Sequence, residues 1–214
     1  MPSPRDAATK LVILDRDGTI NADRDDYVKS PEEWIPLPGA LEGVARLNES
    51  GFHVAVVTNQ SGIGRGLFDM ATLNAMHLKM HGLMAEVGAR VDAVFFCPHG
   101  PSEDCNCRKP KPGLFEQVGQ RFGVNLKGVP AIGDSLRDLQ AAAAVGCETH
   151  LVRTGKAEGL SDEAVAELAA QVPGTVVHAD LRAAADWLIR RERSRKAAAQ
   201  AAKAQAAAGG ASAG

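Results

Sequence analysis

The sequence predicts an α/β fold with a doubly wound, mostly parallel sheet. Three observations predict it: short aliphatic runs recur without strict alternation, helical patterns separate them, and polar residues follow several of the runs. Runs of this kind are typical of strands buried on both faces of a parallel sheet. Strand–helix alternation implies right-handed crossovers, and functional groups in such folds collect at the carboxyl ends of the strands.

Composition indicates one globular domain with an aliphatic core. Of the 214 residues, 45% are hydrophobic and 23% charged, while only 4% are aromatic. The polar N-terminal segment and the lack of a long apolar run lead us to expect a cytoplasmic protein without a membrane span. The net charge of -2 conceals a basic C-terminal segment and an acidic body, and an acidic body argues against nucleic-acid binding. We expect a monomer that acts on a small molecule.

Six strands are expected from the aliphatic runs. They cover residues 11–14, 53–57, 93–96, 129–132, 148–152 and 176–177. Asp15, Thr58, Cys97 and Asp134 stand at or within two residues of the ends of four of these runs. This shared placement predicts that the four side chains belong to one region of the molecule.

Helical patterns fill the gaps between the runs. Pro38 and Gly39 precede a helix over 40–50, which Gly51 is expected to end. Asp69 is a candidate cap for a second helix, whose packing stripe is Leu73, Met76, Met80, Leu83 and Val87. His77 and His81 lie four apart on this helix, but no third metal ligand is evident nearby, so a metal site is not favoured there.

The first chemical motif directly follows the first aliphatic run and reads Asp15-Arg16-Asp17-Gly18-Thr19. Two carboxylates two residues apart at a strand end can share a cation, and one can attack phosphorus while the other moves a proton. Gly18 lets the chain turn sharply out of the strand.

Three further motifs stand at later positions. They are Val57-Thr58-Asn59-Gln60-Ser61, Arg108-Lys109-Pro110-Lys111-Pro112-Gly113 and Ile132-Gly133-Asp134-Ser135-Leu136-Arg137-Asp138. The first offers hydroxyl and amide donors for phosphate oxygens, and the second offers cations that offset phosphate charge. In the third, Asp134 can complete an oxygen-rich magnesium site with Asp15. Asp138, one helical turn on, is expected to steady Lys109 or a metal-bound water.

A fifth motif has the ligand types of a structural zinc site. Its candidate ligands are Cys97, His99, Cys105 and Cys107, in the pattern C-x-H-x5-C-x-C. Three thiolates and one imidazole match a closed tetrahedral zinc site, with no position left open for substrate. Such a zinc would staple the loop that carries Arg108 and Lys109. The fourth cysteine, Cys147, is expected to be a small buried residue.

The four motifs at 15–19, 57–61, 108–113 and 132–138, in this order, resemble those of the haloacid dehalogenase superfamily of phosphotransferases. The resemblance covers about residues 11–154. It implies a Rossmann-like core in which Asp15 is the nucleophile and Asp17 the general acid and base. It also implies that Asp17 reaches magnesium through its main-chain carbonyl, Asp134 completes the site, Thr58 holds the phosphoryl group and Lys109 neutralises it. Lys111 competes for the role of Lys109, because spacing alone does not decide between them.

The zinc loop resembles that of a subgroup containing the heptose bisphosphate 7-phosphatases and the histidinol-phosphate phosphatases. Ser61 and the pair Arg65-Gly66 look like the heptose enzymes, which implies that Arg108 and the segment matching 23–27, with Asp23 and Tyr27, contact substrate. Arg65 is expected to read a second phosphate. The resemblance implies a role in ADP-heptose and lipopolysaccharide synthesis. The short spacer between the zinc ligands resembles the histidinol enzymes, so histidinol phosphate stays an alternative, as does a non-catalytic zinc-stapled binding protein.

The expected organisation has three parts. Residues 1–10 form an N-terminal extension, 11–189 the phosphatase domain, and 190–214 an Ala/Arg/Lys-rich tail that begins as a helix and ends disordered. The gaps at 21–40 and 61–93 are too short for a large cap domain. Loops at 21–27, 61–68 and 97–109 are therefore expected to shape the substrate pocket.

Overall fold

The computed structural model describes residues 10–210. All of the predicted N-terminal extension except Lys10, and the last four residues of the predicted tail, lie outside the described residues. Where helix or strand is assigned, side chains are described as far as residue 202.

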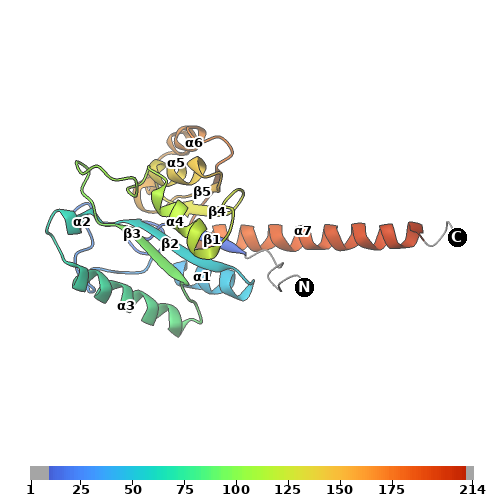
Figure 1. Cartoon of the computed structure of the whole chain (residues 1–214), viewed down its shortest axis with the longest axis horizontal. Coiled ribbons are helices and arrows are strands. Elements are labelled where there is room, and N and C mark those ends of the chain that lie inside the picture. The colour runs from blue at the N-terminus through green and yellow to red at the C-terminus, as the bar shows by residue number, and fades with distance from the viewer. Residues whose placement is uncertain (1–9, 211–214) are drawn as a thin grey trace.

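Within residues 10–210, six parallel strands form one sheet in the order β3-β2-β1-β4-β5-β6 (Figure 1). The strands are β1 (Leu11–Leu14), β2 (His53–Asn59), β3 (Ala93–Cys97), β4 (Pro130–Gly133), β5 (Glu148–Val152) and β6 (Val176–His178). The chain builds outward from β1 to β3 and then crosses back to β4. The point where the strand order reverses therefore lies between β1 and β4, the usual place for a site in open α/β sheets.

Helices cover both faces of the sheet. They are α1 (Ala40–Glu49), α2 (Ser61–Gly64), α3 (Met70–Glu86), α4 (Gly113–Phe122), α5 (Leu136–Ala144), α6 (Asp162–Ala170) and α7 (Leu181–Gly210), with a 3-10 turn η1 (Gly155–Ala157). In β1, Val12 and Leu14 join the core made with α1, α3 and α7, whereas Leu11 and Ile13 join the core made with α4 and α5. Because both faces are buried, β1 is aliphatic at every position, as the sequence indicated.

The predicted elements agree with the structure except at their edges. All six expected strands form, and β2 runs two residues further than expected, so that Thr58 lies inside it. The Asp69 carboxylate caps α3 by accepting a hydrogen bond of 2.8 Å from the Thr72 amide. The packing stripe of α3 was wrong at its end: Val87 follows the last helical turn and is 39% exposed, and Met84 is buried instead.

The last helix continues well past the body of the protein (Figure 1). Leu181, Ala184, Ala185 and Leu188 of α7 pack into the core, and its side chains are exposed from Arg193 to residue 202. The predicted boundary at 189/190 therefore falls inside one continuous helix. None of the helices in the described range is both long enough and apolar enough to cross a membrane.

Candidate active site

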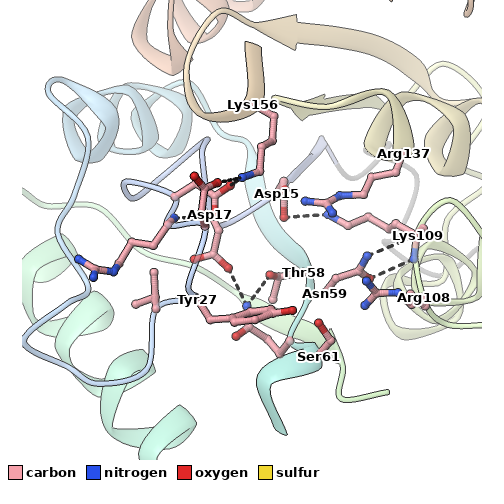
Figure 2. Close-up of a pocket in the computed structure, with 15 residues that line it drawn as sticks. Asp15, Asp17, Tyr27, Thr58, Asn59, Ser61, Arg108, Lys109, Arg137 and Lys156 are labelled. Carbon is pink, nitrogen blue, oxygen red and sulfur yellow. Dashed lines mark hydrogen bonds and ion pairs between the residues drawn. The ribbon is translucent and has the colours of Figure 1, made fainter. Parts of the chain in front are cut away.

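A pocket of about 200 Å³ opens at the carboxyl edge of the sheet, over β1 and β2 (Figure 2). Four carboxylates line it, those of Asp15, Asp17, Asp23 and Asp25. Five cationic side chains also line it, those of Arg24, Arg108, Lys109, Arg137 and Lys156. A small opening that gathers charges of both signs can hold a polar anion and position groups around it.

Asp15 and Lys109 form the centre of this pocket. The Asp15 amide donates to the Ile132 carbonyl, which ties the end of β1 to β4 at 2.9 Å. Lys109 Nζ lies 2.7 Å from Asp15 Oδ1, 2.6 Å from Asp138 Oδ1 and 2.8 Å from the Val57 carbonyl. Lys111 points elsewhere, since it is half exposed and pairs with Asp104 at 3.1 Å. Position therefore favours Lys109 over Lys111 as the phosphate-neutralising lysine.

A third carboxylate completes an oxygen-rich cluster suited to a divalent cation. Carboxylate oxygens of Asp15, Asp134 and Asp138 lie within 4.8 Å of one another, and all three residues are buried. Asp134 Oδ1 has no hydrogen-bond partner among the described residues. Buried carboxylates with a free oxygen are the ligands that magnesium prefers, so the residues fit this ion. The Asp17 side chain is not part of this cluster. That Asp17 reaches magnesium through its main-chain carbonyl stays a prediction.

The crowding of these carboxylates shifts their ionisation. Burial and the negative charge of Asp138 raise the pKa of Asp15 to about 7, against the lowering effect of Lys109. Burial, Asp138 and Asp15 raise the pKa of Asp134 to about 8. Burial alone would lower the pKa of Lys109, but Asp138 and Asp15 outweigh it and raise that pKa. Near pH 7 Asp15 and Asp134 therefore tend to hold protons, and a cation bound between them would favour their charged forms.

Two glycines let the backbone close around Asp134. A Cβ at Gly18 would lie 2.3 Å from Asp134 Oδ2, and a Cβ at Gly155 would lie 2.2 Å from it. Both glycines have positive φ, of 82° and 57°. The Lys156 amide donates to the same oxygen at 2.6 Å. Only glycine permits this close approach, so both positions are required by the geometry of the carboxylate.

Asp17, at the pocket wall, is held as a carboxylate. Arg16 Nη2 donates to both of its oxygens at 2.9 and 3.0 Å, and Asn21 and Gln60 donate at 2.8 and 2.7 Å. Burial would raise the pKa of Asp17, but Arg16 and then the hydrogen bond from Asn21 outweigh it and lower the pKa. Arg16 is fully buried.

The second motif supplies donors next to Asp15. Thr58 is buried, and its Oγ1 accepts from Gln60 Nε2 at 2.9 Å, which leaves the hydroxyl proton free to donate into the pocket. Asn59 exchanges two hydrogen bonds with the backbone of Lys109, at 3.0 and 3.1 Å. Ser61 is buried at the pocket wall. Asn59 thus fixes the loop that carries Lys109, while Thr58 lines the pocket.

The predicted zinc ligands come together beside this loop. Cys97 Sγ lies 3.2 Å from Cys107 Sγ and 3.9 Å from Cys105 Sγ, and His99 Nδ1 lies 3.2 Å from Cys107 Sγ. The four ligand atoms lie within 4.8 Å of one another, and the three thiols form no disulfide. Zinc–sulfur bonds of about 2.3 Å in a tetrahedron place sulfurs roughly this far apart. Arg108 donates to the His99 carbonyl at 3.3 Å, so the segment that carries the zinc ligands sets the position of Arg108.

Loops form the outer wall of the pocket. Asp23 and Tyr27 line it, as expected from the sequence, and Lys156 Nζ holds Asp23 and Asp25 at 3.0 and 2.9 Å. Arg65 does not line the pocket: its guanidinium stands 5.7 Å from the centroid of the Tyr27 ring, outside it. Arg65 therefore contacts the wall of the pocket through the Tyr27 ring.

Sequence reasoning missed Lys156 and Arg137, which both line the pocket, whereas Arg24 and Asp25 line it as part of the expected segment 23–27. The segment with Lys156 was assigned no role. Its place after the fifth predicted strand was a usable signal, because that end meets the same edge of the sheet. Arg137 stood inside the fourth motif without an assigned role, and its Nε has no partner among the described residues.

Two family profiles match the chain. The HAD-hydrolase-like family matches residues 106–184, and the Polynucleotide kinase 3 phosphatase family matches residues 10–134. The chain is also similar to individual relatives over most of its length. The D-glycero-beta-D-manno-heptose-1,7-bisphosphate 7-phosphatase of Bordetella bronchiseptica is 54% identical over 84% of this chain and 98% of that protein. The enzyme of the same name from Pseudomonas aeruginosa is 50% identical over 84% of this chain and 97% of its own length.

Solved structures of proteins with this activity are also similar to this chain. The B. bronchiseptica D,D-heptose 1,7-bisphosphate phosphatase, in a complex with magnesium and phosphate, gives a TM-score of 0.80 at 53% identity. That match covers 86% of this chain and 99% of the other. The phosphatase of the same name from Burkholderia thailandensis gives 0.64 at 50% identity, over 84% and 99% of the two chains.

Proposed function

Since this chain belongs to the D-glycero-beta-D-manno-heptose-1,7-bisphosphate 7-phosphatases, within the HAD-like hydrolases, we propose that it removes the 7-phosphate of that sugar through an aspartyl-phosphate on Asp15. The observation that carries the mechanism is the placement of Asp15. It is buried at the end of β1, 2.7 Å from the Lys109 ammonium and beside Asp134 and Asp138. A carboxylate in this position faces an anion whose charge Lys109 offsets.

In the first step, an Asp15 carboxylate oxygen attacks phosphorus, and the bond between phosphorus and the sugar O7 breaks. The leaving oxygen takes a proton from Asp17. In the second step water attacks phosphorus, the bond to Asp15 breaks, and Asp17 accepts the proton from water. Asp17 is a carboxylate in the described state, which suits the second step directly. For the first step it must carry a proton, and the anionic phosphate entering beside it raises its pKa toward that state.

Other residues bind and orient the phosphate. Thr58 donates its free hydroxyl proton, and Lys109 offsets charge on the transferring group. Asp138 steadies Lys109 through the 2.6 Å ion pair. Magnesium, held by Asp15, Asp134 and the Asp17 carbonyl, would supply further charge neutralisation at the phosphate oxygens.

We assign zinc to the four ligands at 97–107, where it would stabilise the loop that positions Arg108 at the pocket. The assignment is supported by the ligand set and by the absence of any disulfide at these thiols. Four thiols free of disulfides also support a reducing, cytoplasmic location.

The substrate assignment is tested by comparing purified enzyme on heptose 1,7-bisphosphate and histidinol phosphate, with and without magnesium. We expect kcat/KM to favour the heptose by at least about 10-fold, because histidinol phosphate lacks the second phosphate. Preference for histidinol phosphate would overturn the substrate and leave the phosphatase mechanism standing. If neither ester releases phosphate, the result would favour the alternative of a non-catalytic zinc-stapled binding protein.

Arg65 gives a finer test. Arg65→Ala should lower the preference for the bisphosphate over the matching 7-monophosphate by about 3- to 10-fold, less than a direct buried contact would give. The reason is that Arg65 lies outside the pocket and acts through Tyr27. An unchanged ratio would remove Arg65 from recognition of the second phosphate. The monomeric state and the role in ADP-heptose and lipopolysaccharide synthesis stay predictions; light scattering on the purified protein checks the first.

A further inference from the structure

The Arg16 guanidinium has a second partner besides Asp17. Its Nε and Nη2 atoms donate to the Asp17 carboxylate at 2.9 to 3.2 Å, and its Nη1 lies 3.3 Å from His77 Nε2. His77 lies on α3, and the two residues are 61 positions apart in the sequence. The contact therefore links the loop after β1 to a helix on the face of the sheet.

Chemistry fixes the direction of this hydrogen bond. Arginine has only donors and stays charged in proteins, so His77 Nε2 must accept. His77 is therefore neutral, with its proton on Nδ1. Its surroundings support that state: burial first, then the charges of Arg16 and His81, lower the pKa of His77 to about 4, against the raising effect of Asp17.

The contact matters because Arg16 is fully buried. A buried guanidinium needs partners for its donors, and Asp17 alone does not satisfy the Nη1 side. With His77 accepting there, the guanidinium is held from two sides and presents one edge to Asp17. Without that acceptor, the guanidinium can rotate or draw water, and the Asp17 carboxylate loses its fixed position.

We propose that His77 is a positioning residue for the proposed phosphatase reaction: by accepting from Arg16, it holds the guanidinium that orients Asp17 for proton transfer. The inference rests on the proposed function, in which Asp17 protonates the leaving oxygen. His77 touches no reacting atom and does not line the pocket. Its influence passes through Arg16.

The experiment uses three variants of the full chain. His77→Leu removes the acceptor and keeps a good helix former, while His77→Gln keeps an acceptor oxygen. His81→Leu is the matched control, because His81 is exposed one turn further along α3 and makes no hydrogen bond to Arg16 among the described residues. Each is assayed with magnesium on heptose 1,7-bisphosphate and on p-nitrophenyl phosphate. The aryl leaving group departs without needing a proton, so it reports phosphoryl transfer without the acid step.

We expect His77→Leu to lower kcat/KM for the sugar phosphate by about 10- to 100-fold, part of the rate that acid–base catalysis supplies. For the aryl phosphate, the change should stay within about 3-fold, because the acid is not needed there. His77→Gln should recover most of the loss, and His81→Leu should behave as wild type. Equal losses on both esters, no loss with His77→Leu, or no recovery with His77→Gln would each overturn the proposal.

One measurement does not depend on activity. In nitrogen-15 NMR at neutral pH, His77 Nε2 of the wild-type protein should resonate as an unprotonated imidazole nitrogen and Nδ1 as a protonated one. The opposite tautomer, or a doubly protonated ring, would overturn the contact. If wild type shows the expected tautomer but hydrolyses neither ester, the proposed function has failed while the geometry stands.

Discussion

Two regions of this chain bury ionisable side chains, and they differ in how they handle charge. The transfer centre, made of Asp15, Lys109, Asp134 and Asp138, holds Lys109 in two buried ion pairs beside a third carboxylate. The second region is the histidine pair His150 and His178, buried between β5, β6 and α7. His150 Nδ1 lies 3.0 Å from His178 Nε2, so at least one of these two nitrogens is unprotonated. Burial, His178 and Arg191 lower the pKa of His150 to about 3, so this ring is neutral at pH 7.

The difference shows what each region is for. The histidine pair stacks with ring centroids 5.2 Å apart, and Trp187 packs edge-on against both rings, so it serves packing between β5, β6 and α7. The transfer centre buries carboxylates close together, and burial first, then the charge of Asp138, raises the pKa of Asp15 and Asp134. Such an arrangement opposes stability and is useful only if a cation and an anionic substrate bind there.

The largest expected effect comes from Asp15→Asn. Turnover should fall by about 10³-fold or more, because an amide is a poor nucleophile. The melting temperature in chelator should not fall, since the change removes a buried charge that Asp138 opposes. Steady-state kinetics and thermal melts check both. Residual activity above a few per cent of wild type would contradict the covalent mechanism.

Lys109→Met comes next. We expect kcat/KM to fall by about 10²- to 10³-fold, the usual cost of removing a preorganised charge at the reacting group. Lys111→Met is the matched control, because among residues 10–210 Lys111 pairs with Asp104 and the Cys105 carbonyl at the surface and not with Asp15. A larger loss from Lys111→Met than from Lys109→Met would reverse the assignment.

Cys105→Ala tests whether the transfer centre depends on support outside the sheet. Zinc content should drop, and kcat/KM should fall by about 10- to 100-fold, because Arg108 and Lys109 lose a fixed loop. Stability should drop with it. Cys147→Ala is the control, since Cys147 is buried near β5, outside the predicted zinc site. Wild-type protein without zinc in metal analysis would refute the site.

The smallest effect should appear at the histidine pair. The pKa of His150 is lowered in the folded state, so the unfolded chain binds more protons below about pH 6.5. The stability from a neutral His150 is therefore present above that pH and is lost as pH falls toward 3. Between pH 8 and 5, we expect His150 alone to lower the free energy of unfolding by about 2 kcal/mol. Asp15, Asp134 and His77 also titrate differently in the folded state, so this contribution is measured as the difference in pH dependence between wild type and His150→Phe. His81→Gln should show the same pH dependence as wild type. Urea unfolding at both pH values measures it.

The sequence was most informative where chemistry follows a strand. Asp15, Thr58 and Asp134 stand at strand ends, and parallel strands necessarily bring such ends to one edge. The zinc ligands lie within eleven residues of one another, so local spacing alone indicated them.

Contacts over long separations were not predictable from spacing. Which lysine lies beside Asp15 depends on where one loop turns. Lys109 and Lys111 are only two residues apart on that loop, so spacing does not distinguish them. Arg16 and His77 meet only because α3 packs on the face of the sheet next to β1, so His77 was considered only with His81. Val87 was placed in the core because helical periodicity does not say where a helix ends.

The long helix α7 also gives the molecule a direction. It starts just after β6 at the carboxyl edge and runs back past the amino edge, where Arg191 and Arg195 lie beside Leu11 and Pro130. The 30 residues of α7 make a rod of about 45 Å. Its far end extends beyond the sheet and the other helices (Figure 1). A reporter, a surface anchor or a second enzyme fused after this helix would be carried on a stiff arm, clear of the mouth through which substrate enters.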